Sequence, residues 1–497
     1  MRNGQFQNVV YCGGGEMRVT DLNSSTEAIR QRKTEPMSKE KIVVLDGTPT
    51  GEENLTSILT ILTDVLKQNG AKVQVFSLRN MKLAHCIGCF GCWLETPGIC
   101  RFREPGGLEI LKAVMQSGTI FLLTPVTFGG YSSQLKQIVD RFPSHLLPYF
   151  GVYHGEIHHR PRYLRYPRWV GIGVQDSPNT AEANIFRLIV GRNAINLHAP
   201  SYAAQVISST DNPDNLHMVF QSLLTRKDQL PRGKSVKPLM PPGEALANRR
   251  RSDGVPRACL IVGSPKTLSN STSSVLGNHL MDRLKEHGWD TESMTLKTNL
   301  CTASGEAALL ATVDRADLLV FAFPLYVDAL PFLMTRALEL IAKHRRMSGQ
   351  PRLQHLFAIA NNGFPESYQN NLALSICRNF AASSNIIWMG GLAMGAGEII
   401  CGGEPLKPRS ALGFPLTHIT WALNVSADAL VQGQSVRPQA IRGIAKNPIP
   451  YTPFLVWRWL FTFNGGKWWE KRASGHGVDK KRMLARPYDI NTLASRN

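Results

Sequence analysis

Four cysteines crowd into one short stretch of the chain, and they are the residues best suited to chemistry. They are Cys86, Cys89, Cys92 and Cys100, in the pattern C-x2-C-x2-C-x7-C, and they make up four of the nine cysteines in the sequence. A thiolate is a soft ligand for iron or zinc and also a redox nucleophile, and C-x-x-C spacing lets two sulfurs reach one centre. The stretch is therefore a candidate metal site or redox site.

The spacing favours an iron–sulfur cluster over zinc. The ferredoxin run C-x2-C-x2-C-x3-C-P is the closest standard pattern, although here the last gap is longer and no proline follows. Zinc usually takes two separated C-x-x-C pairs, and this sequence has no second pair. Two interpretations stay open: a metal cluster, and a thiol-lined turn that packs beside a cofactor without holding metal.

A second candidate site is the polar loop 264–272, which follows a predicted strand and opens a predicted helix. Its hydroxyl and amide side chains are those of Ser264, Thr267, Asn270, Ser271 and Thr272. Free backbone N–H groups and the positive end of a helix favour a phosphate at such a place. An ordinary helix cap needs fewer polar side chains, so we expect an anion-binding loop.

The elements that must position these residues alternate between strand and helix. Apolar β-branched runs in the first half predict strands at 42–45, 73–78, 119–123 and 170–174. Periodic apolar residues and typical helix ends predict helices up to Asn69 and at 108–115, 131–142 and 181–190. This alternation predicts an α/β domain with a doubly wound parallel sheet, which binds ligands beyond the carboxyl ends of its strands.

The second half repeats the plan, with strands predicted at 258–262, 318–323 and 356–360. The two halves look like a tandem duplication of plan and position, not of residues. We expect a disordered segment 1–40, a first domain 41–228, a Pro- and Arg-rich linker 229–257, a second domain 258–430 and a C-terminal extension 431–497.

Two loops of the first domain differ in what they can bind. Loop 46–56 keeps several hydroxyl groups but adds Glu52 and Glu53, whose carboxylates would repel a phosphate dianion. The turn Thr124-Pro125-Val126-Thr127-Phe128-Gly129-Gly130 has glycines, which let the backbone approach a flat ring, and an aromatic side chain to cover the ring's face. On this turn alone, a plain strand-to-helix connection and a ligand loop are equally favoured.

Two basic segments each have a structural and a functional interpretation. The run 158–168 could meet the phosphates of a nicotinamide nucleotide through bidentate arginines, although such a run is more often a solvated loop. Segment 454–469 mixes aromatic residues with Arg458 and Lys467. A helix docked across both domains is favoured over one lying on a membrane, because Gly465 and Gly466 would interrupt a long membrane-lying helix.

The composition is that of a globular protein, with 43% hydrophobic and 19% charged residues. A net charge of +19 is compatible with nucleic acid, an anionic surface or anionic small molecules, and no nucleic-acid motif is present, so anionic cofactors are favoured. No apolar run approaches the roughly 18 residues of a membrane span, and no signal peptide is recognised. We therefore expect a cytoplasmic protein, in whose reducing surroundings thiols and iron–sulfur clusters persist.

Together these residues resemble the flavodoxin-like NAD(P)H-dependent FMN reductases, and the first domain resembles the iron–sulfur flavoproteins of that superfamily. The resemblance covers roughly residues 41–223 and 255–403. It implies that the FMN phosphate is held by Ser264, Thr267, Asn270, Ser271 and Thr272. It implies that the isoalloxazine is lined by Thr124 to Gly130, by Pro324, Leu325 and Tyr326, and by Asn361, Asn362 and Gly363. The iron–sulfur members bind a 4Fe–4S cluster through a compact four-cysteine motif, which Cys86, Cys89, Cys92 and Cys100 match.

This resemblance implies a flavoprotein oxidoreductase with two flavodoxin-like domains. It would pass electrons from NADH or NADPH through FMN, and through a 4Fe–4S cluster where one is bound, to a small-molecule or protein acceptor. The flavin supplies the hard chemistry, so no catalytic acid or base is singled out. We expect one principal FMN per chain, anchored by loop 264–272 and facing the cysteines, with the two domains forming a dimer within one chain.

Two alternatives remain at this point. The chain could be a non-catalytic flavodoxin-like binding module with a structural or zinc-bound cysteine turn. It could also run redox chemistry through the thiols of its C-x-x-C pairs.

Overall fold

The computed structural model describes residues 40–51, 53–231, 254–265, 271–300, 302–349, 352–400, 405–410, 413–446 and 454–489. Except for Glu40, the segment predicted to be disordered lies outside the described residues. So do most of the predicted linker, Glu52, Thr267 and Asn270.

The first domain is a five-stranded parallel sheet with the strand order β2-β1-β3-β6-β7. Its strands are β1 (Lys41–Asp46), β2 (Lys72–Ser77), β3 (Thr119–Pro125), β6 (Arg168–Gln175) and β7 (Tyr202–Ser208). The central strands are buried on both faces, which is why they are continuous apolar runs. One face is covered by α2 (Glu53–Gln68) and α7 (Pro213–Thr225), and the other by α4 (Pro105–Met115), α5 (Ser133–Val139) and α6 (Thr180–Asn196).

The second domain is a parallel sheet with the order β9-β8-β10-β11-β12. Its strands are β8 (Arg257–Val262), β9 (Asp290–Thr295), β10 (Leu318–Pro324), β11 (His355–Asn361) and β12 (Ile387–Met394). The outer face is covered by α8 (Thr272–Glu286), α13 (Thr417–Val431) and α14 (Pro438–Ile444), and the inner face by α10 (Ala303–Arg315), α11 (Phe332–Met347) and α12 (Asn371–Ser383).

Both sheets have the flavodoxin order 2-1-3-4-5 when strands are numbered within each domain. The predicted fold class, two doubly wound parallel-sheet domains, is therefore confirmed. Strands β7, β9 and β12 and the antiparallel hairpin of β4 (Leu146–Tyr153) and β5 (Glu156–Pro161) are not predicted by the pattern. The helix predicted at 131–142 is shorter, because the Ser132 hydroxyl caps its start by accepting a hydrogen bond from the Leu135 N–H at 3.3 Å.

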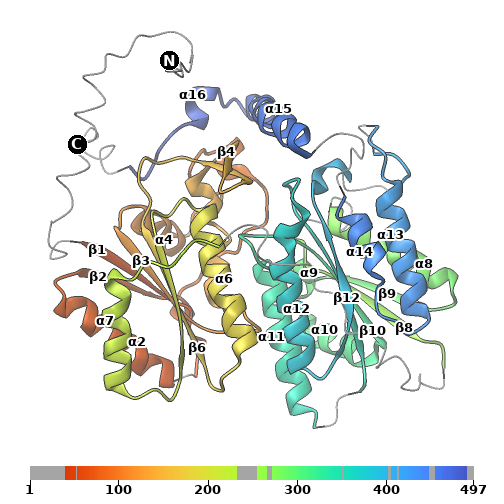
Figure 1. The fold of residues 1–497 in the computed structure, drawn as a ribbon, viewed down its shortest axis with the longest axis horizontal. Coiled ribbons are helices and arrows are strands. Elements are labelled where there is room, and N and C mark those ends of the chain that lie inside the picture. The colour runs from red at the N-terminus through yellow and green to blue at the C-terminus, as the bar shows by residue number, and fades with distance from the viewer. Residues whose placement is uncertain are drawn as a thin grey trace, which may run out of the picture.

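The inner helix layers of the two domains pack against each other (Figure 1). Helix α5 lies against α11, and α6 lies against α12. These pairs are equivalent helices, because α5 and α11 follow the third strand of their sheets and α6 and α12 follow the fourth. One continuous hydrophobic cluster includes buried residues of both inner faces, among them Leu135, Ile138, Met334 and Leu338. The two domains therefore share a core.

The contact between α5 and α11 is reciprocal. The N–H of Ser133, the first residue of α5, donates to Glu339 Oε1 at 2.8 Å, and the N–H of Phe332, the first residue of α11, donates to Asp140 Oδ2 at 2.8 Å. Each carboxylate stands seven residues after the first residue of its own helix. An isologous two-fold contact requires this pattern, in which residue i meets j and j meets i.

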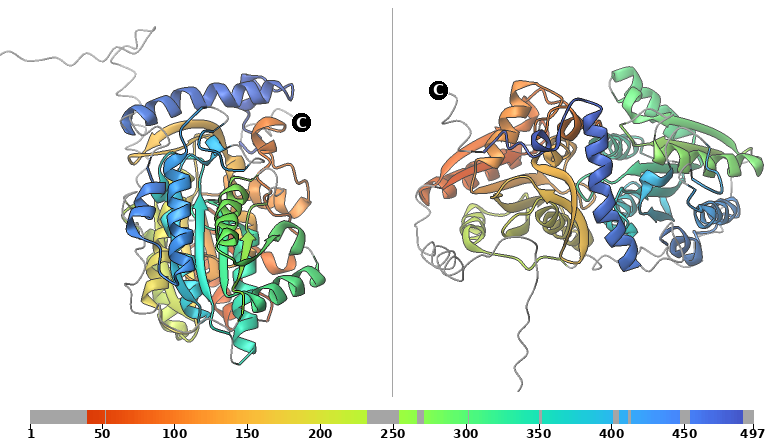
Figure 2. Two further views of the ribbon diagram at one scale, coloured as in Figure 1. Left: turned by 90° about the vertical axis from the view of Figure 1, so that its right-hand side faces the viewer. Right: turned by 90° about the horizontal axis from the view of Figure 1, so that it is seen from above.

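The C-terminal helices α15 (Phe454–Ser474) and α16 (Lys480–Met483) lie across one end of the molecule (Figures 1 and 2). α15 packs on β4 and on α3 (Gly91–Leu94), where Trp469 and Ala473 join a hydrophobic cluster with Trp93 and Phe150. The docked helix that the sequence favours is thus observed. None of the helices within the described residues is long and apolar enough to cross a bilayer.

Glu366 joins the second domain to the hairpin and to α15. It is 1% exposed, accepts a hydrogen bond from the Ile157 N–H at 3.0 Å and lies 3.7 Å from the Arg458 guanidinium. Burial raises the pKa of its carboxyl to about 7, although the amide and Arg458 oppose that rise. The folded state therefore holds this proton more tightly than the unfolded chain does.

We expect Asp140→Asn to lower the free energy of unfolding by about 3–5 kcal/mol, because it leaves the buried Lys136 ammonium without its partner. Urea denaturation measures the change. The exposed carboxylate Asp64 provides the control, since Asp64→Asn should change stability by less than about 0.5 kcal/mol. Equal effects of the two substitutions would contradict a structural role for Asp140.

We expect Glu366 to make the chain less stable as pH rises. Its stabilising contribution is complete below about pH 4.5 and is lost as pH rises through 7, a difference of roughly 3 kcal/mol. Glu366→Gln should flatten the dependence of unfolding free energy on pH in this window, whereas Glu109→Gln, at an exposed carboxylate, should not. A Glu366→Gln variant with the wild-type slope would assign the slope to other groups.

Candidate active site at the cysteine turn

The cysteine turn, residues 85–100, runs from just after the 3₁₀ helix Leu78–Asn80 through α3. Its backbone folds around two sulfurs: the Gly88 N–H lies 3.5 Å from Cys86 Sγ, and the Gly91 N–H lies 3.4 Å from Cys89 Sγ. Gly88 and Phe90 have φ angles of +63° and +57°, which turn the chain tightly enough to direct these amides inward. Amide donors of this kind favour the thiolate over the thiol.

The four cysteines share one electrostatic environment. Burial, with smaller contributions from Asp140, Cys100 and Cys89, raises the pKa of Cys86 to about 12, although the Gly88 amide opposes the rise. Burial also raises the pKa of Cys92 well above its ordinary value, with Cys86, Cys100 and Cys89 adding to the rise. Thiolates that lie close together repel one another, so without added positive charge Cys86 and Cys92 stay protonated.

The donor set is soft and made of sulfur alone, which suits an iron–sulfur group and not a hard cation. Among the described residues, no group of three or more His, Cys, Asp or Glu side chains is arranged to hold a single metal ion. The four thiols are therefore chemically compatible with an iron–sulfur group, although their arrangement in this structure is not that of a metal site.

The second domain covers one side of the cysteine turn. The His85 ring stacks on Phe332 with centroids 5.3 Å apart, and burial together with Lys297 lowers the pKa of His85. Tyr326 lies at the same place: burial raises the pKa of its phenol well above the ordinary value, and Cys86, Asp140 and Cys89 act in the same direction. Cysteine turn and second-domain loop thus meet across the domain interface.

The C-terminal extension covers the other side. Phe90 stacks on Trp93 with centroids 5.4 Å apart, and Trp469 of α15 meets both rings edge-on. A Cβ on Gly98 would come within 2.6 Å of Pro487, so only glycine allows the extension to lie this close. Burial raises the pKa of Tyr488 to about 12, with Cys100 adding to the rise. The turn is therefore enclosed from two directions.

The predicted flavin loops of the second domain are tied together. Ser271 caps α8 and Thr272 opens it, while Asn361 ends β11 and is followed by Asn362 and Gly363. The Ser273 hydroxyl donates to Asn361 Oδ1 at 2.7 Å, and the Leu325 N–H donates to the Asn361 carbonyl at 2.8 Å. The structure therefore brings the described parts of the three loops to one sheet edge, with Ser264 buried beside them and Pro324 ending β10.

The turn after β10 is strained and has a counterpart after β3. Val327 and Asp328 have φ angles of +45° and +59°, a region that a β-branched residue rarely enters. Tyr326 and Ala329 form an isolated bridge, as Thr127 and Gly130 do in the first domain. Strain of this kind is often kept where a loop serves a function.

Each turn is held by the other domain. Asn193 Nδ2 of α6 donates to the Val327 carbonyl at 3.0 Å, and Asn379 Nδ2 of α12 donates to the Phe128 carbonyl at 3.0 Å. Phe128 packs edge-on against Phe380, with centroids 5.3 Å apart. The aromatic side chain predicted to cover a ring is thus part of the domain interface.

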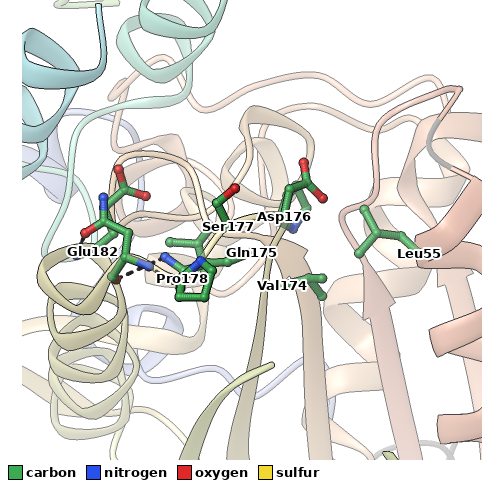
Figure 3. A pocket seen from close by; sticks show the side chains of 10 residues that line it. Leu55, Val174, Gln175, Asp176, Ser177, Pro178 and Glu182 are labelled. Carbon is green, nitrogen blue, oxygen red and sulfur yellow. Dashed lines mark hydrogen bonds between the residues drawn. The ribbon is translucent and has the colours of Figure 1, made fainter. Parts of the chain in front are cut away.

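The first domain has a cavity of about 300 Å³ at the carboxyl ends of β3 and β6. It is lined by Leu55, Pro125, Val126, Val174, Gln175, Asp176, Ser177, Pro178, Asn179 and Glu182. Figure 3 shows Leu55 on one side and Glu182 on the other. Two carboxylates and no lysine or arginine line this cavity, so it is poorly suited to a phosphate dianion. The predicted Thr124 and Thr127 are not among its lining residues.

The first loop of this domain, where a phosphate would bind, contains the buried carboxylate of Asp46. Asp46 is fully buried, accepts a hydrogen bond from the Thr48 N–H at 3.0 Å and pairs with Arg79 at 2.8 Å. Glu52 lies outside the described residues, and the Glu53 side chain is not described. Asp46 therefore supplies a separate reason why a phosphate would not bind at this loop.

The expectation of a solvated loop is wrong for the centre of the basic run 158–168. His158 is buried in β5, and Arg162 is 1% exposed. The Arg162 guanidinium donates to the carbonyls of Leu146, Met483 and Ala485. Arg162 thus fastens the C-terminal extension and is not available to a nucleotide.

Several residues of the site have no signal in the sequence. Lys136 is 2% exposed, pairs with Asp140 and donates to the Tyr326 carbonyl at 2.6 Å. Arg192 bridges Glu156 and Asp328 across the domains. In the sequence, Lys136 and Arg192 look like ordinary charged positions on helices. Only Asp328, which lies in the turn after a predicted strand, could have drawn attention.

Comparison with known proteins supports the resemblance. Residues 40–160 match the model of the family described as NADPH-dependent FMN reductase. An iron–sulfur flavoprotein of Methanocaldococcus jannaschii is 35% identical over 101 residues, which are 20% of this chain and 51% of that protein. One from Archaeoglobus fulgidus is 28% identical over 109 residues, 22% of this chain and 46% of its own. The chain spans about half the length of the curated relatives it matches.

Among solved structures, an NAD(P)H:quinone oxidoreductase from Methanothermobacter marburgensis covers 38% of this chain and 100% of its own, with 13% identity and a TM-score of 0.32. An FMN-dependent NADH-azoreductase from Bacillus anthracis, solved with FMN, covers 35% of this chain and 99% of its own, with 14% identity and a TM-score of 0.27. The match of residues 40–160 confirms the predicted resemblance of the first domain to the NADPH-dependent FMN reductases and the iron–sulfur flavoproteins.

Proposed function

We propose that this chain is an NAD(P)H-dependent FMN oxidoreductase with a 4Fe–4S cluster on the cysteine turn. The observation that supports this most is the stacking of His85, the residue before Cys86, on Phe332 of the second domain, which begins the helix after the predicted flavin loop; the two ring centroids are 5.3 Å apart. Electron transfer needs its two centres close together, and this interface is where a flavin and a cluster would be adjacent. The electron acceptor is a small molecule or a protein.

We assign the FMN phosphate to loop 264–272 and the ring to the loops after β10 and β11. Bound FMN supplies hydride acceptance from the nicotinamide and electron release to the next centre. The chain's own part is to hold and shield it. The start of α8 offers amides to an anion, and the strained turn at Val327, fixed by Asn193, presents the Tyr326 edge.

The cluster ligands would be Cys86, Cys89, Cys92 and Cys100. Their amide donors, the nearby Arg162, which opposes the rise that burial causes in the pKa of Cys92, and the aromatic cover from Trp93 and Trp469 all suit thiolates kept away from water. Exclusion of water protects such a centre and strengthens the electrostatic effect of each neighbouring charge.

We further propose that the two domains form a dimer within one chain and bind one principal FMN. Support comes from the reciprocal bonds of Asp140 and Glu339 and the paired bonds of Asn193 and Asn379. The first domain's loop is occupied by Asp46, and its cavity is acidic. The proposed site in the second domain is therefore suited to FMN, and the equivalent site in the first domain is not.

The cluster is tested by iron and sulfide counts and an anaerobic visible spectrum. Cys89→Ser should remove both iron and acid-labile sulfide, because one of four ligands is lost. Cys377→Ser, at a cysteine buried in α12, is the matched control and should retain them. Iron-free wild-type protein with full reductase activity would refute the cluster and leave the thiol-turn interpretation.

The flavin site is tested by flavin content. Thr267→Ala/Asn270→Ala should lower FMN retention by at least tenfold, since two polar partners of the phosphate are lost at about 1 kcal/mol or more each. The corresponding loop of the first domain supplies the control, Thr48→Ala/Thr50→Ala, which should keep one FMN per chain. Two FMN per fully loaded chain, or flavin loss in the control alone, would contradict the assignment.

A further inference from the structure

Helix α15 turns small residues toward the protein. Among the side chains that are described in this helix, its inward side includes Gly465, Gly466, Thr462 and Ala473, together with the larger Arg458 and Trp469. A Cβ on Gly465 would come within 2.5 Å of Phe150, and one on Gly466 within 3.2 Å of Tyr149. The glycines that would weaken an isolated helix thus allow this one to lie closely on the β4–β5 hairpin.

The large apolar residues of α15 are on the outside. Leu455 is 73% exposed, Trp459 63% and Phe463 58%, with Val456 and Trp468 also exposed. Trp459 and Phe463 stack face to face in solvent, with centroids 5.8 Å apart. A helix that docks only to complete a fold buries its large apolar side chains and exposes the small or polar ones. In the described part of α15, most of the large apolar side chains are instead exposed.

This exposure is concentrated and surrounded by positive charge. Of the four large aromatic side chains that are exposed among the described residues, only Trp421 lies outside α15. Cations stand over the exposed rings: Lys467 Nζ lies 5.2 Å from the centroid of Phe463, and the Arg472 guanidinium lies 4.6 Å from that of Trp468. Eight Lys and Arg residues but only three Asp and Glu residues fall within 454–489.

A groove of about 370 Å³ runs between α15 and the hairpin, beside the exposed rings. Its walls combine Tyr149, Phe150, Trp459 and Phe463 with Arg160, Lys467 and Lys480, and one carboxylate, Glu470. Glu470 accepts a hydrogen bond from the Tyr149 hydroxyl at 3.1 Å and lies 3.3 Å from Lys480 Nζ. Aromatic walls with an excess of cations suit a ligand that is apolar at one end and anionic at the other.

We propose that this end of the molecule binds the surface of an anionic lipid bilayer. The outer face of α15, defined by Leu455, Val456, Trp459, Phe463 and Trp468, enters the interface between headgroups and acyl chains, and the helix lies parallel to the membrane. Lys467, Lys480 and Arg160 meet lipid phosphates at the groove. Figure 2 shows α15 along the outer edge of the molecule, where a flat surface can reach it.

The proposed membrane binding does not depend on the proposed reaction, but it would determine where the cysteine turn lies relative to the membrane. Trp469, on the inward side of the same helix, contacts Phe90 and Trp93 of the cysteine turn. The cysteine turn would therefore lie directly beneath the membrane-facing helix.

Vesicle flotation of the full chain tests the proposal. The protein should float with vesicles of phosphatidylcholine containing roughly one third phosphatidylglycerol, much less with phosphatidylcholine alone, and less at high salt. Trp459→Ala/Phe463→Ala should weaken binding about tenfold or more, because the rings enter the interface. Lys467→Gln should weaken it about fivefold. The exposed pair Met218→Ala/Met347→Ala, on α7 and α11, is the matched control and should leave binding unchanged.

Three results would overturn the proposal. The first is no flotation with either vesicle, and the second is equal loss of flotation in the control pair. The third is a dimer in light scattering that Trp459→Ala/Phe463→Ala dissociates, which would show that a second copy covers the face. Thermal midpoints equal to that of the wild type would establish that the variants are folded.

Discussion

The structure depends on the exchange of carboxylates between α5 and α11. Each helix begins at the domain interface, where its first N–H would be buried without a partner, and a carboxylate from the opposite helix accepts that N–H. A buried amide left unpaired would cost about as much as a lost hydrogen bond, and the charge also favours the positive end of the helix. The two strand-end turns are held in the same way by Asn193 and Asn379. Each domain therefore supplies a hydrogen bond to a strand-end turn of the other.

The contact between the two domains also helps to enclose the cysteine turn. The cysteine turn is too long and too irregular to bury its own backbone, so it needs walls from elsewhere. Phe332 and Tyr326 supply one wall, and Trp469 and Tyr488 supply the other. Burial raises the pKa of Cys86 and Cys92, so the enclosure that shields the sulfurs also makes thiolates costly unless positive charge is added. The site is consequently more suited to a cationic metal group than to free thiols that exchange electrons as thiolates.

Much of the fold could be predicted from the sequence, because its signals are local. Central strands such as β1 and β10 are buried on both faces and therefore appear as unbroken apolar runs. The edge strand β9 reads DTESMT and offers no such signal. The crowding of the cysteines is also a local signal. The partners of that turn are not local: Asp140 meets an amide 192 residues further on, and Lys136 donates to a carbonyl 190 residues away. No spacing rule links such pairs, since only the packing of two whole domains creates them.

The two domains differ in their connections, which is possible because each has its own segment of one chain. A homodimer carries every insertion twice, on both sides of its axis, whereas a fused pair can change one side alone. The connection between β2 and α4, residues 78–104, contains the cysteine turn, but its counterpart between β9 and α10 spans only 296–302. The β4–β5 hairpin follows α5, and the counterpart after α11 is the short connection 348–354. Both additions therefore belong to the first domain, and helix α15 rests on both of them, through α3 of the cysteine turn and through β4 of the hairpin. The proposal of a single FMN site agrees with this asymmetry, because the buried Asp46 carboxylate lies in the first domain at the loop equivalent to the one assigned to the FMN phosphate.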